Sequence, residues 1–176
     1  MAQAAEVAAA LERAREIFRR RPEAALHEDA PSVARWAGGL QVAASHPGGH
    51  QVRIDMPAEL GGGGEFATGG WLLRSALAGC LATTIVMTAA EQGIAMDRVE
   101  VRATSRSDAR GLLGMPGADG VAVNPGPQEL RLEVTIAAAG VDAQRLRELV
   151  EEADRRSAVS AAIRNGLLLP VRIEIA

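Results

Sequence analysis

The feature that most constrains the fold of this chain is an uncharged stretch near its middle, within WLLRSALAGCLATTIVMTAAEQ at residues 71–92. No charged side chain occurs from Ser75 to Ala90, and this part holds one glycine and no proline. Such a pattern predicts a helix that is buried on nearly all sides. The only cysteine of the chain, Cys80, lies at its middle. Helical spacing places the following residues on the same face as Cys80: Leu73, Ala76, Leu77, Thr83, Thr84 and Met87.

Composition limits the class of protein. The 176 residues suffice for one well-buried domain. A net charge of -3 and a pI near 5.7 provide no basic surface, so we expect no nucleic-acid partner. The uncharged run is shorter than the roughly 20 residues of a membrane span, so we expect no membrane segment. The chain starts without a secretory pattern, and one cysteine cannot form an internal disulfide. Both observations favour a cytoplasmic location.

Periodicity predicts the remaining elements. An amphipathic helix is expected from Ala4 to Arg20, before Pro22, and we separate residues 1–30 from a main domain at residues 31–176. Alternating apolar residues predict strands at Ser32–Trp36, Leu40–Ala44, Gln51–Met56, Asp97–Ser107, Gln128–Ala137 and Leu169–Ala176. The strands at 97–107 and 128–137 are expected to pair as a hairpin across an irregular loop. Two further helices are expected at Val141–Arg156, with Asp142 as its cap, and at Ser157–Leu167.

Three local motifs favour structural roles over ligand binding. In QVRIDM, alternation places Asp55 on the outward face of its strand. Four glycines at Gly61–Gly64 favour a flexible entry to the central helix over a phosphate-binding loop, because the Gly-Lys-Ser/Thr ending is missing. Thr68 is the expected helix cap. His46 and His50 flank a Pro-Gly-Gly turn with no third ligand nearby, so we expect a turn and no metal site.

Two motifs carry a resemblance to a known family. The segments MPAELGGGG and WLLRSALAGCLATT, and the carboxyl-terminal SAVSAAIRNGLLLPVRIEI, resemble the osmotically induced and organic-hydroperoxide-resistance proteins (OsmC/Ohr). The resemblance covers about Pro31 to Ala176. It implies an α+β fold in which antiparallel sheets wrap around a central buried helix. It also implies an intertwined homodimer whose central helices meet at the dimer interface.

The same resemblance implies a chemistry for Cys80. In that family a first cysteine attacks an organic hydroperoxide as a thiolate, and a second cysteine resolves the sulfenic acid as a disulfide. Cys80 falls on the first cysteine, whereas Ser157 occupies the place of the second. The following Ser and Arg of that motif fall on Ser160 and Arg164. Self-resolution within one chain is therefore absent, because serine forms no disulfide.

The family also pairs an arginine of the amino-terminal strands with a glutamate of the helix motif, which favours the thiolate because a nearby positive charge lowers a thiol pKa. The glutamate position falls on Trp71 and the arginine position near Gly39. The candidates to supply positive charge to the thiol are therefore Arg35, Arg53 and Arg164.

Three interpretations of Cys80 stay open at this point. The first is a one-cysteine thiol peroxidase that reduces organic hydroperoxides with an external thiol and needs no cofactor. The second is a dimeric binding protein for a small hydrophobic molecule, with a pocket formed by Trp71, Leu77 and Thr84. The third is a cysteine that simply fills a core position, as buried unpaired cysteines often do.

Overall fold

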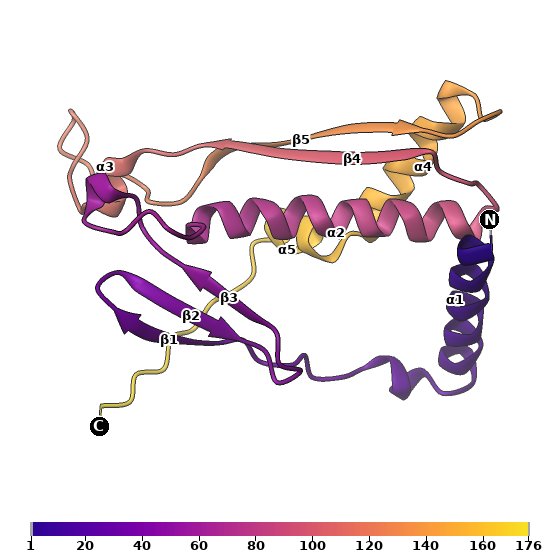
Figure 1. The fold of residues 1–176 in the computed structure, drawn as a ribbon, viewed down its shortest axis with the longest axis horizontal. Coiled ribbons are helices and arrows are strands. Elements are labelled where there is room, and N and C mark those ends of the chain that lie inside the picture. Colours follow the sequence, from indigo (N-terminus) through magenta and orange to yellow (C-terminus); the bar gives the residue numbers. More distant parts are fainter. Residues whose placement is uncertain (1, 176) are drawn as a thin grey trace. The chain divides into compact units, whose positions relative to one another are not determined.

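A computed structural model describes residues 2–175 and has the expected α+β composition (Figure 1). The helices are α1 (Ala2–Arg20), α2 (Gly69–Glu91), α3 (Ala109–Leu112), α4 (Ala143–Arg156) and α5 (Ala158–Asn165), with short 3-10 turns η1 (Pro22–Ala25) and η2 (Ala58–Leu60). The strands are β1 (Val33–Gly38), β2 (Gln41–Ser45), β3 (Gln51–Ile54), β4 (Arg98–Arg106) and β5 (Gln128–Ala137). Every predicted element except the last strand is confirmed, with ends shifted by at most two residues.

The chain divides into two compact units. Unit 1 comprises Met1–Ala9, Ala76–Arg102 and Leu132–Ala176, and unit 2 comprises Ala10–Ser75 and Ala103–Arg131. Several elements contribute to both units, including α2, which begins in unit 2 and continues into unit 1. The predicted boundary near residue 30 coincides with neither unit and stays a prediction.

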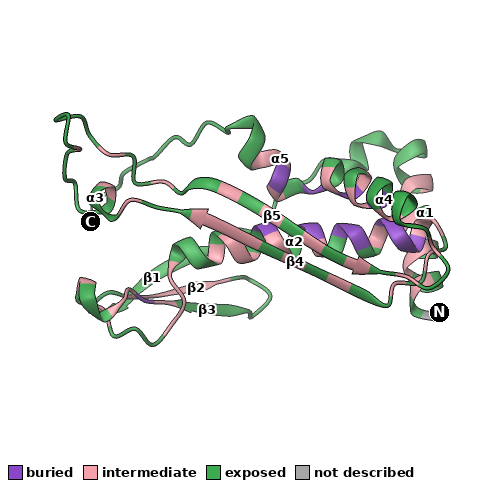
Figure 2. Cartoon of the chain, turned by 90° about the horizontal axis from the view of Figure 1, so that it is seen from above, coloured by how far each residue is buried: buried purple, intermediate pink, exposed green. Residues whose placement is uncertain are grey.

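The core of unit 1 forms where α2 meets α4 and the β4–β5 hairpin. Leu81, Ile85 and Ala89 of α2 pack against Leu149 and Ala153 of α4, all of them buried. Alternate residues of the two strands complete this core because successive side chains of a strand point to opposite faces. The strand residues packed against the core are Val99, Val101, Leu132, Val134 and Ile136. Figure 2 shows the buried residues along α2.

The ends of these helices follow the expected capping chemistry. The hydroxyl of Thr68 accepts a hydrogen bond from the amide of Trp71 at 3.2 Å, which confirms Thr68 as the cap of α2. Gly93 follows α2 with a φ of 68°, a left-handed conformation that glycine adopts without steric cost. The Asp142 carboxylate accepts from the amide of Arg145 at 3.0 Å and caps α4, as predicted.

The prediction that α2 is buried on nearly all sides is wrong for the single chain. Trp71 is 53% exposed, and Leu73 and Val86 are exposed as well. With 23 residues, α2 is also long and apolar enough to cross a membrane by length and composition alone. A core helix passes the same test, and α2 supplies three of the five buried residues of the unit 1 core. Packing within its own chain therefore leaves these apolar side chains of α2 uncovered.

Unit 2 contains an antiparallel sheet in the order β1-β2-β3. Val42 of β2 faces Trp36 on one side and Ile54 on the other, and a bulge interrupts β1 between Trp36 and Gly38. The turn between β2 and β3 is closed by the ring of His46, which accepts a hydrogen bond from the amide of Gly48 at 2.9 Å. His46 therefore has the turn role expected from the sequence.

The prediction that Asp55 points outward is wrong. Its side chain is 0% exposed and accepts hydrogen bonds from the amides of Met56, Gly63 and Glu65 at 2.8, 3.1 and 3.4 Å. Strand β3 ends at Ile54, so the alternation that predicted the orientation no longer applies one residue later. Burial alone would raise the pKa of Asp55, but these amide donors and Gln41 hold the pKa of its carboxyl below the ordinary value.

The glycine run is a closely packed turn around Asp55, in contrast to the flexible entry that the sequence predicted. A Cβ added to Gly62 would lie 1.9 Å from the carbonyl oxygen of Met56, and one added to Gly63 would lie 2.9 Å from the Asp55 carboxylate. Only glycine allows so close an approach of the backbone. The run therefore encloses a buried carboxylate before α2 begins.

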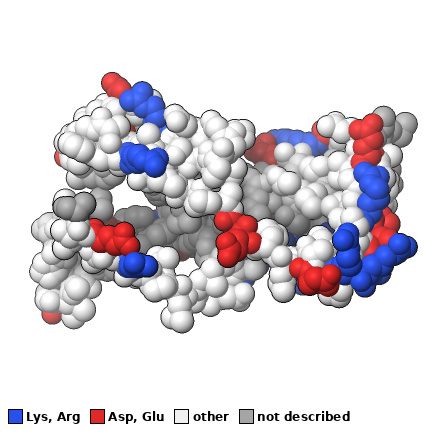
Figure 3. Space-filling model, turned by 90° about the horizontal axis from the view of Figure 1, so that it is seen from below, with Lys and Arg blue, Asp and Glu red and all other residues white. Residues whose placement is uncertain are grey.

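Six of the seven charged side chains of α1 lie from Glu12 onward, and Figure 3 shows acidic and basic groups gathered together at the right of the view, where α1 lies. Arg19 pairs with Glu12 at 3.0 Å and with Glu16 at 2.9 Å, and Arg20 pairs with Glu16 at 2.6 Å. These pairs are exposed, so each contributes little stability. The arginines at the end of α1 thus belong to a solvated, ion-paired face, as the sequence suggested.

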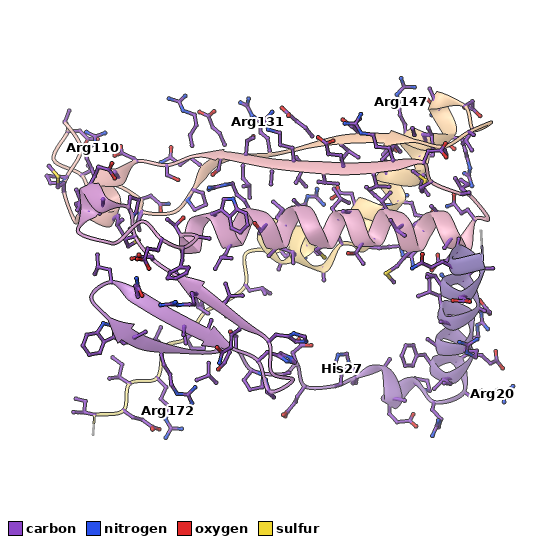
Figure 4. The ribbon with its side chains drawn as sticks, viewed as in Figure 1. Arg20, His27, Arg110, Arg131, Arg147 and Arg172 are labelled. Atoms are coloured by element: carbon purple, nitrogen blue, oxygen red, sulfur yellow. The ribbon has the colours of Figure 1, made fainter. Side chains whose placement is uncertain are left out.

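The predicted last strand, Leu169–Ala176, is absent from the described part, and its final residue lies outside the described residues. Residues 167–175 form no helix or strand, and their apolar side chains are exposed, with Ile175 at 95%. Arg172 extends from this segment and pairs only with its neighbour Glu174, at 2.9 Å (Figure 4). A strand needs a partner for its backbone hydrogen bonds, and residues 2–175 of one chain provide none for this segment.

Candidate functional site

The candidate site is formed by Cys80 and the start of α5, both within unit 1. Cys80 lies in α2 and is partly buried. The hydroxyl of Ser157, the N-cap residue of α5, donates a hydrogen bond to the Cys80 sulfur at 3.4 Å. The Ser157 side chain is completely buried. The two residues that the sequence placed on the family's two cysteine positions are therefore in direct contact.

The electrostatic environment of Cys80 favours its thiolate. Burial alone would raise the pKa of the Cys80 thiol, but hydrogen bonds from the Ser157 hydroxyl and from the amides of Val159 and Ala158 lower this pKa below its ordinary value. The first amides of a helix have no partner within the helix and carry the positive end of its dipole. The start of α5 thus supplies the positive potential that a thiolate needs.

The α4–α5 junction brings this helix start to Cys80. Arg156 ends α4 and Ser157 follows directly, with an extended backbone that turns the chain into α5. The Arg156 guanidinium contacts Glu91 of α2 with both terminal nitrogens, at 2.7 and 2.8 Å. Arg164 of α5 pairs with Asp154 of α4 at 2.6 Å, which joins the two helices.

Two of the three predicted pocket residues lie in the same unit as Cys80. Leu77 and Thr84 are both buried on α2, and Thr84 donates to the carbonyl oxygen of Cys80 at 2.8 Å. Ser160, one turn after Ser157, is also buried, and its hydroxyl has no hydrogen-bond partner within the described chain. Trp71 belongs to unit 2 and is exposed. A pocket shared by Trp71, Leu77 and Thr84 stays a prediction.

Two of the three candidate arginines have contacts elsewhere, and the third is exposed on a strand. Arg164 pairs with Asp154, whereas Arg53 donates to Gln41 at 2.9 Å and lies 4.0 Å from the centre of the Phe66 ring. Arg35 lies on β1 and is exposed. Within residues 2–175, the groups that lower the pKa of Cys80 are hydrogen-bond donors, and none of them is an arginine. A thiolate-stabilising role for these arginines stays a prediction.

Sequence reasoning missed the amides of Ala158 and Val159. The sequence did predict a helix starting at Ser157, and a serine directly before a helical run also signals an N-cap followed by unpaired amides. That this start faces Cys80, 77 residues earlier, carries no local signal. The contact depends on how α4 and α5 pack against α2.

Several solved structures have the same fold. An OsmC-like protein from Mycoplasma pneumoniae is 15% identical, with a TM-score of 0.64 over 80% of this chain and 91% of that one. An organic hydroperoxide resistance protein from Legionella pneumophila is 22% identical, with a TM-score of 0.56 over 78% and 92%. One from Elizabethkingia anophelis is 19% identical, with a TM-score of 0.53 over 80% and 91%. Identities this low establish the fold alone.

The sequence itself matches a family model. No curated protein is similar enough to the chain to count as a match. The model described as OsmC-like protein, however, matches residues 62–171, which is more than half of the chain. The match includes both Cys80 and Ser157. This match and the shared fold confirm the resemblance found in the sequence, and the chain belongs to the OsmC-like protein family.

Proposed function

We propose that this protein is a one-cysteine thiol peroxidase that reduces organic hydroperoxides through Cys80. The observation that carries the proposal is the contact between the Cys80 sulfur and the start of α5, because its donors lower the pKa of the thiol. A buried cysteine that only filled the core would have a raised pKa. Two solved relatives of the same fold are named organic hydroperoxide resistance proteins, which agrees with this chemistry.

The reaction consists of an oxidation and a two-step reduction. The Cys80 thiolate attacks the outer oxygen of a hydroperoxide, the O–O bond breaks, and the alkoxide leaves as an alcohol after taking a proton. Cys80 becomes a sulfenic acid. An external thiol condenses with it, releasing water and forming a mixed disulfide. A second external thiol then attacks this disulfide, which restores Cys80 and releases the oxidised reductant.

Because residue 157 is a serine, the sulfenic acid of Cys80 must be reduced by a thiol from another molecule. The Ser157 hydroxyl lies 3.4 Å from the sulfur, in the position that the family resemblance gives to a second cysteine. An oxygen there donates a hydrogen bond to the thiolate but forms no disulfide. Ser157 therefore activates Cys80 without resolving its sulfenic acid.

We further propose that the active form is a homodimer. Trp71, Leu73 and Val86 of α2 are exposed apolar side chains that a second copy would cover. The unpaired segment 167–175 has an alternating apolar pattern and open backbone groups, which a sheet edge of the second copy would satisfy. Both features have one explanation in a partner chain of the same sequence.

The proposed activity is tested by adding one equivalent of an alkyl hydroperoxide to the reduced protein and probing for sulfenic acid. We expect labelling at Cys80 and consumption of the peroxide, both lost in Cys80→Ser. Ser160→Ala is the control, because Ser160 is buried on α5, three residues after Ser157, but has no hydrogen-bond partner in the described chain. Wild-type protein that remains reduced and unlabelled would contradict the proposal.

A further inference from the structure

We infer that Arg156 and Glu91 are positioning residues that hold the start of α5 against the Cys80 sulfur without contacting the sulfur themselves. The inference rests on the proposed function, since it concerns the same thiol. It is carried by the geometry of an ion pair between the end of α4 and the end of α2.

The pair has the geometry of a specific contact. Arg156 donates from Nη1 to Oε2 of Glu91 at 2.7 Å and from Nη2 to Oε1 at 2.8 Å, a bidentate arrangement that fixes direction as well as distance. The Glu91 side chain is only 10% exposed, and that of Arg156 is half-buried. Such a pair holds its geometry better than the exposed pairs of α1, in which both side chains are solvated.

The pair is joined to the site along one face of α2. Cys80, Thr84, Thr88 and Glu91 lie at spacings of four, four and three residues, so they form a single row on the helix. Arg156 also donates to the Thr88 hydroxyl at 3.2 Å, and Thr88 donates to the carbonyl of Thr84 at 2.8 Å. The guanidinium therefore fastens the end of α4 to the same row that carries the sulfur.

The consequence for the thiol follows from the chain itself. Ser157 is the residue after Arg156, and the amides of Ala158 and Val159 come next. Hydrogen bonds to sulfur weaken steeply when the donor moves or tilts. The contact of Arg156 with α2 thus fixes the Ser157 hydroxyl and the two amides, because all three donors lie within three residues of Arg156.

The effect of the pair is positional, because its charges largely cancel. Arg156 is paired with Glu91 and lies 3.7 Å from Glu152 of its own helix. The other charged groups at this junction, Arg164 and Asp154, are paired with each other. The groups at the start of α5 that hydrogen-bond to the sulfur are uncharged.

The test uses the pH profile of Cys80 alkylation by iodoacetamide, which needs no peroxide. In Arg156→Met and Glu91→Gln we expect the profile to move upward by about one pH unit, equivalent to about a tenfold slower reaction at neutral pH. Arg156→Lys keeps a point charge but loses the bidentate contact, so it should restore only part of the shift. Glu148→Gln is the control, because it removes an exposed pair with Arg145 on the same helix.

The result decides the inference separately from the peroxidase activity. Profiles of Arg156→Met and Glu91→Gln that coincide with wild type would overturn it, as would an equal shift in Glu148→Gln. If Arg156→Met does not fold, Glu91→Gln, which keeps a neutral acceptor of the same shape, gives the answer alone. A wild-type protein with the expected profile but no peroxide consumption would overturn the proposed function and leave the inference standing.

Discussion

The Ser157 hydroxyl donates a hydrogen bond to the Cys80 sulfur across 3.4 Å, although 77 residues separate the two in sequence. The contact joins the middle of α2 to the residue that directly precedes α5. It has two consequences: the thiolate gains a donor, and the place of a second sulfur is taken by oxygen.

Exchanging that oxygen for sulfur should create a disulfide. In Ser157→Cys we expect the introduced thiol and Cys80 to oxidise to an internal bridge, because a modest side-chain rotation closes the 3.4 Å separation. Intact mass after peroxide treatment, with loss of both thiol hydrogens, measures the bridge. The double variant that also carries Cys80→Ser is the control and should lose none. Free thiols that persist in Ser157→Cys would show that the side chains do not approach each other.

Removing the Ser157 hydroxyl should weaken the thiolate. In Ser157→Ala we expect the pKa of Cys80 to rise by about one unit, because a hydrogen bond to a charged group contributes about 1.5–3 kcal/mol. Because the pKa of the wild-type thiol is lowered, its alkylation rate reaches a plateau at a lower pH than that of an ordinary cysteine. The plateau of the variant should lie at a higher pH than that of wild type. Ser160→Ala should leave the profile unchanged. Identical profiles for all three proteins would contradict this prediction.

The buried carboxylate of Asp55 should make the free energy of unfolding depend on pH. Its pKa lies below the ordinary value, so its contribution is present above the pKa of the unfolded chain and is lost as the pH falls through the lower pKa of the folded chain. Asp55→Asn should be less stable than wild type near neutral pH and should lose less stability on acidification. Urea unfolding at several pH values measures both effects. Parallel pH curves for the two proteins would show that Asp55 contributes no proton linkage.

Adding a methyl group within the glycine run should disrupt the turn around Asp55. Gly62→Ala places a Cβ 1.9 Å from the Met56 carbonyl oxygen, so the backbone must move, at a cost of about 2–3 kcal/mol. Gly69→Ala is the matched control, because nothing lies within 4 Å of its added Cβ. Thermal unfolding compares the two. Equal midpoints would mean that the turn shifts without strain.

Removing the carboxyl-terminal segment should dissociate the proposed dimer. Without residues 168–176, the chain loses the exposed alternating segment that a second copy would pair. We expect sedimentation to show a dimer for the full chain and a monomer for the shortened one. Arg172→Gln, which breaks only the exposed pair with Glu174, should remain dimeric. A monomeric full-length protein would refute the dimer outright.

Much of the fold could be predicted from local patterns. The uncharged run around Cys80 predicted α2, and the alternation in residues 97–107 and 128–137 predicted the hairpin. The caps at Thr68 and Asp142 follow from side-chain chemistry that involves only neighbouring residues. The prediction for Asp55 failed because this residue lies one position after the end of β3. The alternation of side chains along the strand therefore no longer determines where Asp55 points.

The sequence by itself determined the family, the order of the predicted elements up to α5 and the candidate sulfur, because each depends on residue types at fixed spacings. Only the tertiary structure decided which groups surround that sulfur. The start of α5 reaches Cys80 through the packing of α4 and α5 on α2, and the candidates Arg53 and Arg164 contact other residues. The physical reason is that a thiol pKa is set by donors and charges within a few ångströms, whatever their distance along the chain.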